Sequence, residues 1–318
     1  MASPPVIAVI GSLNADLVMY TPYIPKAGET MTAHTFHTGL GGKGANQAVA
    51  CAKLSRTSGS PSPSSKSASA VVRMIGAVGN DTNGRNMLEG LAGYGVDASD
   101  VTVVEGVSTG VAIILVEDNG ENRILLSAGA NHTVTPDAFE KGFPGPKPDI
   151  IIMQLEIPME TVLKCLIMAR RENIPVILNP APAQAIPAEH LKGLEHIIVN
   201  ETEAMIMTGC DESLLKTAKG LEAATKILKD AGVQNVVITL GGQGVFYSAA
   251  DGTNELVPAE KVQVVDTTAA GDTFVAVYAL EIAKGSTLGQ AVLLANKAAS
   301  KTVQKKGAQE SIPWLDEL

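Results

Sequence analysis

The chain is short of aromatic residues and of cysteine, and it carries an excess of acidic charge. Aromatic residues make up 3% of its 318 positions, so the core must be aliphatic, and a hydrophobic content of 45% is ample for that. Cys51, Cys165 and Cys210 show no CxxC pairing, which argues against a disulfide framework and is typical of a reducing compartment. The formal net charge of −9 argues against nucleic acid or an anionic membrane as a partner.

Long hydrophobic runs are also missing. No stretch approaches the ~18 apolar residues of a membrane span, and no basic segment precedes the apolar run near the N-terminus. We therefore expect a cytoplasmic protein, with a nuclear location left open. No G-x-S-x-G elbow is present, which argues against an α/β-hydrolase.

Short continuous apolar runs alternate with amphipathic helical stretches along most of the chain. The first run, 6–10, ends at Gly11. Similar runs stand at 71–78, 149–153, 175–178, 196–199 and 235–240, and the clearest helical stretches are 159–173 and 218–231. This alternation predicts an α/β fold with a doubly wound, mostly parallel central sheet and helices on both faces. We expect residues 1–318 to form a single catalytic domain.

Two segments do not fit that alternation. Residues 15–38 and 107–128 carry β-branched or alternating patterns, and Asp118-Asn119-Gly120 is a hairpin signal. We interpret them as a small antiparallel sheet that forms a lid over the ligand site; the alternative is an ordinary edge hairpin. Residues 57–70 are polar and of low complexity, which predicts a flexible surface loop.

Residues 264–283 are the starting point for predicting the function. A turn of small residues, Ala269-Ala270-Gly271, leads into Asp272 and a helical pattern. The backbone N–H groups of 270–272 should be unpaired there, and a helix N-terminus attracts anions. Asp272 would then take a proton from a substrate hydroxyl while these groups hold the transferring phosphate. The alternative is an acidic residue that only stabilises its helix.

Residues 39–44 match G-x-G-x-x-G and precede a helical stretch at 45–55, so a dinucleotide site must be weighed. Such a site needs an acidic residue about 20 positions on, and none occurs between Ala45 and Asn80. A Walker loop is excluded because Lys43 precedes Gly44 rather than Ser or Thr. What remains is a backbone able to lie against a polyhydroxylated ligand, with Lys43 and Asn46 as polar arms, or a glycine turn without function.

Polar residues follow several of the predicted strands, at the edge where parallel sheets bind ligands. They are Asn14 and Asp16, then Glu156, then Asn200, Glu201 and Glu203, then the glycine turn 239–244. The acids suit Mg²⁺ held mostly through water. The alternatives are turn formation for Asn14 and Asp16, and helix stabilisation for Glu201 and Glu203. A zinc site at His34 and His37 is not expected, because no third ligand stands nearby.

Two segments resemble the signatures of the PfkB-type carbohydrate kinases: GGKGAN at 41–46 and DTTAAGDTF at 266–274. Further segments are similar to the ribokinase branch of that family: GSLNADLV (11–18), QLEIP (154–158), NPAPA (179–183), NETEA (200–204), TLGGQG (239–244) and KGAQESIP (306–313). The resemblance spans the whole chain with the motifs in order. It implies ATP-dependent phosphorylation of the 5-hydroxyl of ribose, with a small β lid that pairs two subunits.

The resemblance also implies roles for individual residues. Asp272 would be the base, and Ala269, Ala270, Gly271 and Asp272 would supply the anion hole. Ribose would be held by Asn14, Asp16, Gly42, Lys43, Asn46, Glu156 and Asp272. ATP would lie against Asn200, Thr239, Gly241, Gly242, Gly244, Gly271 and Asn296. Mg²⁺ would be associated with Asn200 and Glu203. K⁺ would be bound by Asp266, Thr268, Thr302, Lys305, Gly307 and Ser311.

Some features leave alternatives open. Lys305 is basic, so only its carbonyl could bind a cation, and the segment 57–70 looks like an insertion. Another sugar or nucleoside kinase of the same family is the nearest rival, because the phosphate machinery is shared. A non-catalytic sugar or ATP sensor is the rival from a different class, and the intact Asp272 turn argues against it.

Overall fold

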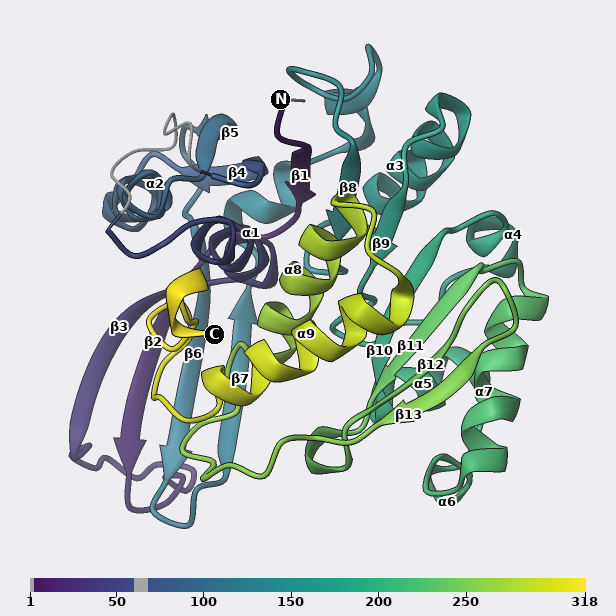
Figure 1. Cartoon of the computed structure of the whole chain (residues 1–318). Coiled ribbons are helices and arrows are strands. Elements are labelled where there is room, and N and C mark those ends of the chain that lie inside the picture. The colour runs from purple at the N-terminus through teal and green to yellow at the C-terminus, as the bar shows by residue number, and fades with distance from the viewer. Residues whose placement is uncertain (1–2, 60–67) are drawn as a thin grey trace.

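A nine-stranded sheet forms the centre of the protein, seen in a computed structural model that describes residues 3–59 and 68–318. Its spatial order is β13-β12-β11-β10-β9-β8-β1-β4-β5 (Figure 1). The strands are β1 (Val6–Ile10), β4 (Val71–Gly79), β5 (Asp97–Val104), β8 (Ile150–Met153), β9 (Val176–Leu178), β10 (His196–Asn200), β11 (Asn235–Thr239), β12 (Val245–Ser248) and β13 (Asn254–Val257). All six predicted apolar runs are strands of this sheet. Every pair from β5 to β11 is parallel, and β12 and β13 add an antiparallel edge.

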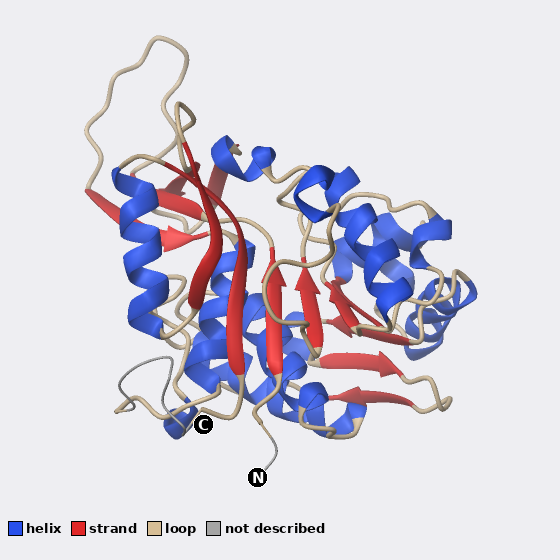
Figure 2. Ribbon diagram, turned by 90° about the horizontal axis from the view of Figure 1, so that it is seen from above, coloured by secondary structure: helices blue, strands red, loops and turns tan. Residues whose placement is uncertain are grey.

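Helices cover both faces of the sheet, as predicted (Figure 2). One layer contains α1 (Lys43–Leu54), α2 (Thr82–Tyr94), α8 (Ala270–Ala283) and α9 (Leu288–Thr302). The other contains α3 (Met159–Glu172), α4 (Ala188–Leu191), α5 (Glu201–Thr208), α6 (Glu212–Leu215) and α7 (Ala218–Asp230). Short 3₁₀ turns are η1 (Gly129–Thr133), η2 (Pro136–Phe139), η3 (Gly241–Gln243) and η4 (Leu315–Glu317).

Strand β1 shows how the sequence builds two cores from one sheet. Ile7 and Val9 pack into the core on the α1 and α8 side, whereas Ala8 and Ile10 pack into the core on the α3 side. Successive side chains of a strand point to opposite faces, so an apolar run without alternation serves a sheet that is buried on both sides.

A second sheet of four strands forms the lid, in the order β3-β2-β6-β7. Its strands are β2 (Asn14–Thr21), β3 (Thr35–Gly41), β6 (Gly110–Glu117) and β7 (Asn122–Ser127). The β2–β3 and β6–β7 pairs are antiparallel, but β2 and β6 run parallel, so the prediction of an antiparallel sheet is wrong for the central pair. Both strands leave the same edge of the central sheet, β2 after β1 and β6 after β5, and therefore run in one direction.

Several smaller predictions can be compared with the structure. The hairpin turn at 118–120 joins β6 to β7, with Gly120 at φ 85°. Cys51 and Cys165 are buried free thiols whose pKa burial raises, which suppresses thiolate chemistry. Most of the predicted surface loop 57–70 lies outside the described residues. None of the described helices has the length and apolar character needed to cross a membrane.

Candidate active site

The N-terminus of α8 begins at the carboxyl edge of the central sheet. Ala269 precedes the helix with φ 60°, a left-handed conformation that turns the chain into it. The N–H groups of Gly271 and Asp272 have no acceptor among the described residues, so both are available to an anion. The N–H of Ala270 donates to the Thr267 carbonyl at 3.3 Å. The prediction of free donors throughout 270–272 is therefore wrong for Ala270.

The Asp272 carboxylate lies in the first turn of α8 and is 7% exposed. Its Oδ2 accepts a hydrogen bond from Asn46 Nδ2 at 3.1 Å, and its Oδ1 accepts one from Gln47 Nε2 at 2.9 Å. A carboxylate held by donors on both oxygens has a defined orientation. Asp272 is thus more than a helix-stabilising acid, since its side chain is directed at α1 and at the cavity described next.

A cavity of about 500 Å³ opens between the central sheet, the lid and the first turn of α8. It is lined by every residue expected to contact a sugar: Asn14, Asp16, Gly42, Lys43, Asn46, Glu156 and Asp272. The lid contributes an apolar wall of Ala112, Ile114, Ile124 and Leu126. A polar floor facing an apolar wall suits a small polyhydroxylated ligand, which offers hydroxyl groups on its rim and C–H groups on its faces.

Hydrogen bonds among its own residues organise the floor of this cavity. Glu156 Oε2 accepts from the Ser12 hydroxyl at 2.5 Å and from the backbone N–H of Lys43 at 3.0 Å. Asn14 Oδ1 accepts from Asn131 Nδ2 at 2.7 Å, which leaves the Asn14 amide N–H groups for the cavity. A Cβ at Gly41 would lie 2.1 Å from Asp16 Oδ2, so the glycine turn makes room for this carboxylate.

Carboxylates are crowded around Lys43. Burial raises the pKa of Asp16 to about 7, and the negative charges of Glu156 and Asp272 add to that effect. Burial by itself would lower the pKa of Lys43, but Asp272, Glu156 and Glu203 outweigh it and the pKa is raised. Lys43 is therefore a permanent cation inside a negatively charged cavity, beside the Asp272 carboxylate.

A second cavity of about 690 Å³ lies on the other side of the α8 N-terminus. It is lined by all the residues expected to contact a nucleotide: Asn200, Thr239, Gly241, Gly242, Gly244, Gly271 and Asn296. Apolar side chains of Val262, Val264, Phe274, Ala299 and Val303 form a further part of the wall. Residues 259–264, which follow β13, were not identified from the sequence.

The two cavities meet at the N-terminus of α8. Four residues line both of them, namely Asn200, Thr239, Thr267 and Gly271. Asp272 lines only the first cavity, and Ala270 lines only the second one. A group passing from one cavity to the other would therefore pass the free N–H donors at 271–272, next to a carboxylate.

Asn200 and Glu203 form a capping box at the start of α5. The Asn200 side chain accepts from the Glu203 N–H at 2.8 Å, and Glu203 accepts from the Asn200 N–H and side-chain amide at 2.8 and 3.0 Å. Burial raises the pKa of Glu203, which is 6% exposed. Helix stabilisation therefore accounts for both carboxylate oxygens, and any Mg²⁺ at this position would be reached through water.

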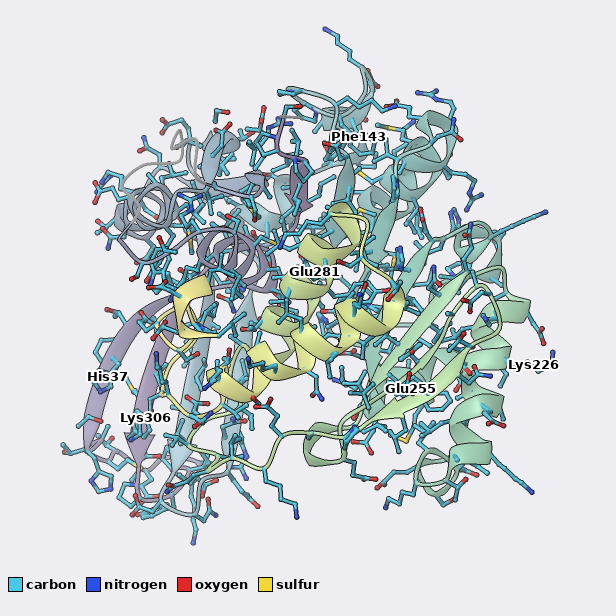
Figure 3. All side chains as sticks on the ribbon, in the orientation of Figure 1. His37, Phe143, Lys226, Glu255, Glu281 and Lys306 are labelled. Atoms are coloured by element: carbon cyan, nitrogen blue, oxygen red, sulfur yellow. The ribbon has the colours of Figure 1, made fainter. Side chains whose placement is uncertain are left out.

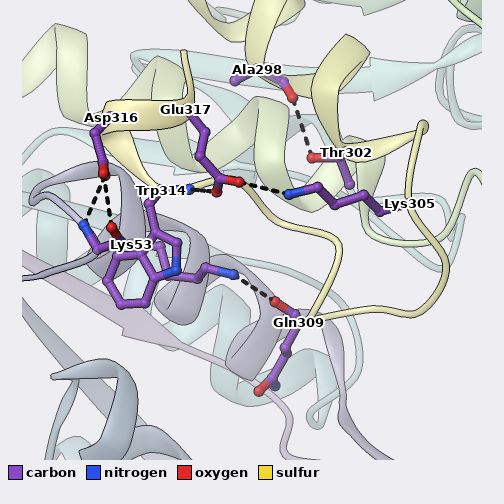
Figure 4. Close-up of polar contacts among 9 residues, drawn as sticks. Lys53, Ala298, Thr302, Lys305, Gln309, Trp314, Asp316 and Glu317 are labelled. Carbon is purple, nitrogen blue, oxygen red and sulfur yellow. Dashed lines mark hydrogen bonds and ion pairs between the residues drawn. The ribbon is translucent and has the colours of Figure 1, made fainter.

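The residues expected to bind K⁺ come from two converging segments. Asp266 Oδ1 accepts from Thr268, and its Oδ2 accepts from the Gly307 N–H at 3.0 Å, which joins residues 266–268 to 307. Thr302 and Ser311 are buried nearby, in the segments that flank this junction. The ammonium of Lys305 pairs with Glu317 at 2.8 Å (Figure 4), so its side chain serves the C-terminal segment.

His34 and His37, the two histidines considered as zinc ligands, lie at the lid. His37 lies on the lid edge strand β3 (Figure 3), and His34 contacts Asp118 at 3.2 Å. Among the described residues no three His, Cys, Asp or Glu side chains gather to hold a metal ion.

Comparisons with known proteins show which family this chain resembles along its length. Residues 5–315 match the model described as the pfkB family carbohydrate kinase. The ribokinase of Schizosaccharomyces pombe is 44% identical over 98% of this chain and 96% of its own length, and a deoxyribokinase of Salmonella typhi is 35% identical over 98% and 97%. The Arabidopsis thaliana ribokinase complexed with ribose and ATP superposes with a TM-score of 0.84 at 30% identity, covering 99% of this chain and 97% of that one. The chain belongs to the pfkB family of carbohydrate kinases.

Proposed function

We propose that this protein is an ATP-dependent kinase that phosphorylates the 5-hydroxyl of D-ribose to give D-ribose 5-phosphate. The observation that carries the proposal is the junction of the two cavities, where Gly271 lines both and Asp272 lines the polar one. The relatives support the choice of substrate, since those that share the whole length of this chain include ribokinases and a ribokinase complexed with ribose and ATP.

The sugar cavity supplies the acceptor side of the reaction. Asn14, Asp16, Lys43 and Glu156 offer the amide and charged groups that ring hydroxyls need, and Asp272 receives the hydroxyl to be phosphorylated. Phosphoryl transfer passes through a loose transition state in which positioning and charge stabilisation dominate, so Asp272 needs to orient the hydroxyl and take its proton late. A strong base is unnecessary for that task.

The second cavity supplies the donor side. ATP would lie against the glycine turn 241–244 and the apolar wall around Phe274, with its terminal phosphate at the junction. There the N–H groups of Gly271 and Asp272, together with Lys43, offset the negative charge that the transferring group brings. These local donors and the Lys43 cation are needed because the chain as a whole carries a net charge of −9.

Mg²⁺ fits the site as a partner of ATP. Among the described residues, no three His, Cys, Asp or Glu side chains are placed so that they could hold a metal ion by themselves. The ion would therefore be held by phosphate oxygens and water, with Asn200 and Glu203 behind the water. When bound, it would neutralise phosphate charge.

K⁺ fits the junction of residues 266–268 and 307. The Asp266 carboxylate is held in place there by Thr268 and Gly307, and these bonds outweigh burial and lower its pKa, so the oxygen donors keep their charge. Hydroxyl, carboxylate and backbone carbonyl oxygens are the donors that a hard cation prefers. Bound K⁺ would stiffen the loop that leads into α8.

A homodimer through the lid is part of the proposal. Phe36 and Leu125 are each more than half exposed on the lid strands and line neither cavity, and exposed apolar side chains of this kind are typical of an interaction surface. The compartment in which the protein works stays a prediction from its composition.

A sugar panel tests the function. ADP formation from ATP would be measured with D-ribose, 2-deoxy-D-ribose, D-fructose, adenosine and ketodeoxygluconate, in K⁺ and in Na⁺, and phosphorus NMR would locate the new ester. We expect the highest kcat/KM with D-ribose, phosphorylation at carbon 5, and faster turnover in K⁺. A higher kcat/KM with 2-deoxy-D-ribose would mean that deoxyribose, and not ribose, is the preferred substrate. Equal rates in K⁺ and in Na⁺ would contradict the proposed K⁺ site.

The substitution Asp272→Asn tests the mechanism. We expect kcat to fall by about 10²-fold or more because the proton acceptor is lost. Ribose binding, measured by calorimetry, should persist, since the amide keeps the shape of the side chain. Near wild-type turnover in this variant would remove Asp272 from the reaction, and tight binding of sugars without turnover in the wild type would indicate a sensor.

A further inference from the structure

The Asp272 carboxylate is supported from behind by a chain of buried amides. Asn46, one of its two partners, lines the sugar cavity, whereas the other partner, Gln47, lines neither cavity and is 0% exposed. Gln47 has no ligand to contact, yet its Nε2 lies 2.9 Å from Asp272 Oδ1. Its side chain therefore acts on the site through its hydrogen-bond partners Asp272 and Asn179, both of which line the sugar cavity.

The orientation of the Gln47 amide is determined by its neighbours. Gln154 Nε2 donates to Gln47 Oε1 at 2.6 Å, and Gln47 Nε2 donates to Asn179 Oδ1 at 3.1 Å as well as to Asp272. Both amide hydrogens and the amide oxygen of Gln47 are thus in use. Turning the amide over would place its oxygen against the Asp272 carboxylate and its NH₂ group against the Gln154 donor. Both contacts would then be repulsive.

Gln154, at the end of this row of amides away from Asp272, sets the orientation of Gln47. Gln154 Oε1 is buried and has no hydrogen-bond partner among the described residues. Turning the Gln154 amide over would place this oxygen against Gln47 Oε1, which is also an acceptor, and the hydrogen bond between them would be lost. The donors therefore run in one direction, from Gln154 through Gln47 to the charged carboxylate. Gly11 leaves the space for this arrangement, because a Cβ there would lie 2.0 Å from Gln154 Oε1.

We propose that Gln47 is a positioning residue for the reaction: its amide holds Asp272 in the orientation that receives the proton of the sugar hydroxyl. The inference rests on the proposed kinase function. With Oδ1 held by Gln47 and Oδ2 by Asn46, rotation of the carboxylate is blocked. The lone pairs that neither amide uses are left for the hydroxyl.

The first test removes the donor and keeps the shape, with Gln47→Met. We expect kcat for ribose to fall by about 10- to 100-fold, because a small displacement of a reacting group costs that much, while KM changes by less than about threefold. Wild-type kcat in a folded Gln47→Met variant would overturn the proposal. An inactive wild type would instead count against the proposed function, so the two failures are distinguishable.

The second test, Gln47→Glu, has a readout that a merely structural role would not move. A carboxylate placed against Asp272 should shift the acidic limb of the kcat profile to higher pH by about one unit or more, because two carboxylates sharing a site resist ionising together. The other charged groups facing Asp272 are Lys43, Asp16, Glu156 and Glu203, all unchanged by this substitution. An unshifted profile would overturn the proposal.

Two further variants complete the design. Gln234→Glu adds the same charge at an exposed residue outside both cavities, and its pH profile should match the wild type. If both Gln47 variants fail to fold, Gln154→Glu makes the same test without replacing Gln47. Its carboxylate would accept from Gln47 Nε2, turn that amide over and deprive Asp272 of the donor. We expect kcat to fall as in Gln47→Met, and unchanged kcat would overturn the proposal.

Discussion

Helix α1 carries a lysine near each end, and the surroundings of these two lysines shift their pKa values in opposite directions. Lys43, at the first position, lines the sugar cavity among Asp272, Glu156 and Glu203, which raise its pKa. Lys53, in the last turn, is 3% exposed, and its Nζ lies 5.4 Å from the ring centroids of both Tyr94 and Trp314. Burial lowers the pKa of Lys53 to about 8.

The difference separates a cation used for chemistry from one used for structure. Lys53 donates to the Gln309 carbonyl at 3.1 Å and so attaches the C-terminal segment to α1 (Figure 4). Aromatic faces offset part of the cost of burying its charge, but less completely than nearby carboxylates would. At the Lys43 end of the helix, carboxylates outnumber cations, so the cavity carries net negative charge. Such an excess of like charge serves ligand binding at a cost in the stability of the fold.

The largest effect should come from Lys43→Met. Among the described residues, Lys43 is the only Lys or Arg that lines this cavity. Its removal takes away charge stabilisation at the point of phosphoryl transfer, so we expect kcat/KM for ribose to fall by about 10²- to 10³-fold. Steady-state kinetics measures this. Lys53→Met is the matched control, with the same substitution in the same helix, and should keep kcat/KM within about threefold. Equal losses in the two variants would break the contrast between them.

The parts of the site that the sequence predicts are those set by local pattern. Short apolar runs place the six inner strands, and polar residues directly after them, such as Asn14 and Glu156, line one cavity because parallel strands end at one edge. The glycine turn and the small residues before Asp272 are visible for the same reason. Each signal lies within a few residues of the element that positions it.

The parts that were missed depend on contacts between distant segments. Gln47 and Gln154 look like ordinary polar residues in the sequence, and only the fold brings them together with Asp272, 225 positions after Gln47. The parallel pairing of β2 with β6 follows from where β1 and β5 end in space, which no local pattern reveals. The signal that the sequence offered for Gln47 was a polar side chain in an otherwise largely apolar helical segment, residues 45–52.

A smaller effect is expected from Asp16→Asn, which tests whether the Lys43 end sacrifices stability. Burial and the neighbouring carboxylates raise the pKa of Asp16 from 3.8 to about 7 in the folded protein. The folded state then binds more protons than the unfolded state between those values, so the wild type loses stability as pH rises from about 4 to 7. The variant lacks this loss.

The measurement is the melting temperature of both proteins across that range. We expect the two to coincide near pH 4, the variant to gain relative to the wild type up to pH 7, and the gap to stay constant above it. If the difference in melting temperature did not change with pH, the pKa of Asp16 would not be raised in the folded protein. The interpretation of this cavity as negatively charged would then be wrong.

The smallest effect should come from the pH dependence of Lys53→Met. Because the folded pKa of about 8 lies below the ordinary value of 10.5, the unfolded state binds more protons between those values. The wild type should therefore gain stability relative to Lys53→Met as pH rises from 8 to 10.5, and the difference should be constant below 8. Chemical denaturation at pH 7, 8, 9 and 10 would measure it. If the difference instead stayed constant from pH 7 to 10, burial would not be lowering the pKa of Lys53, and the aromatic rings would be stabilising its charge as the carboxylates stabilise that of Lys43.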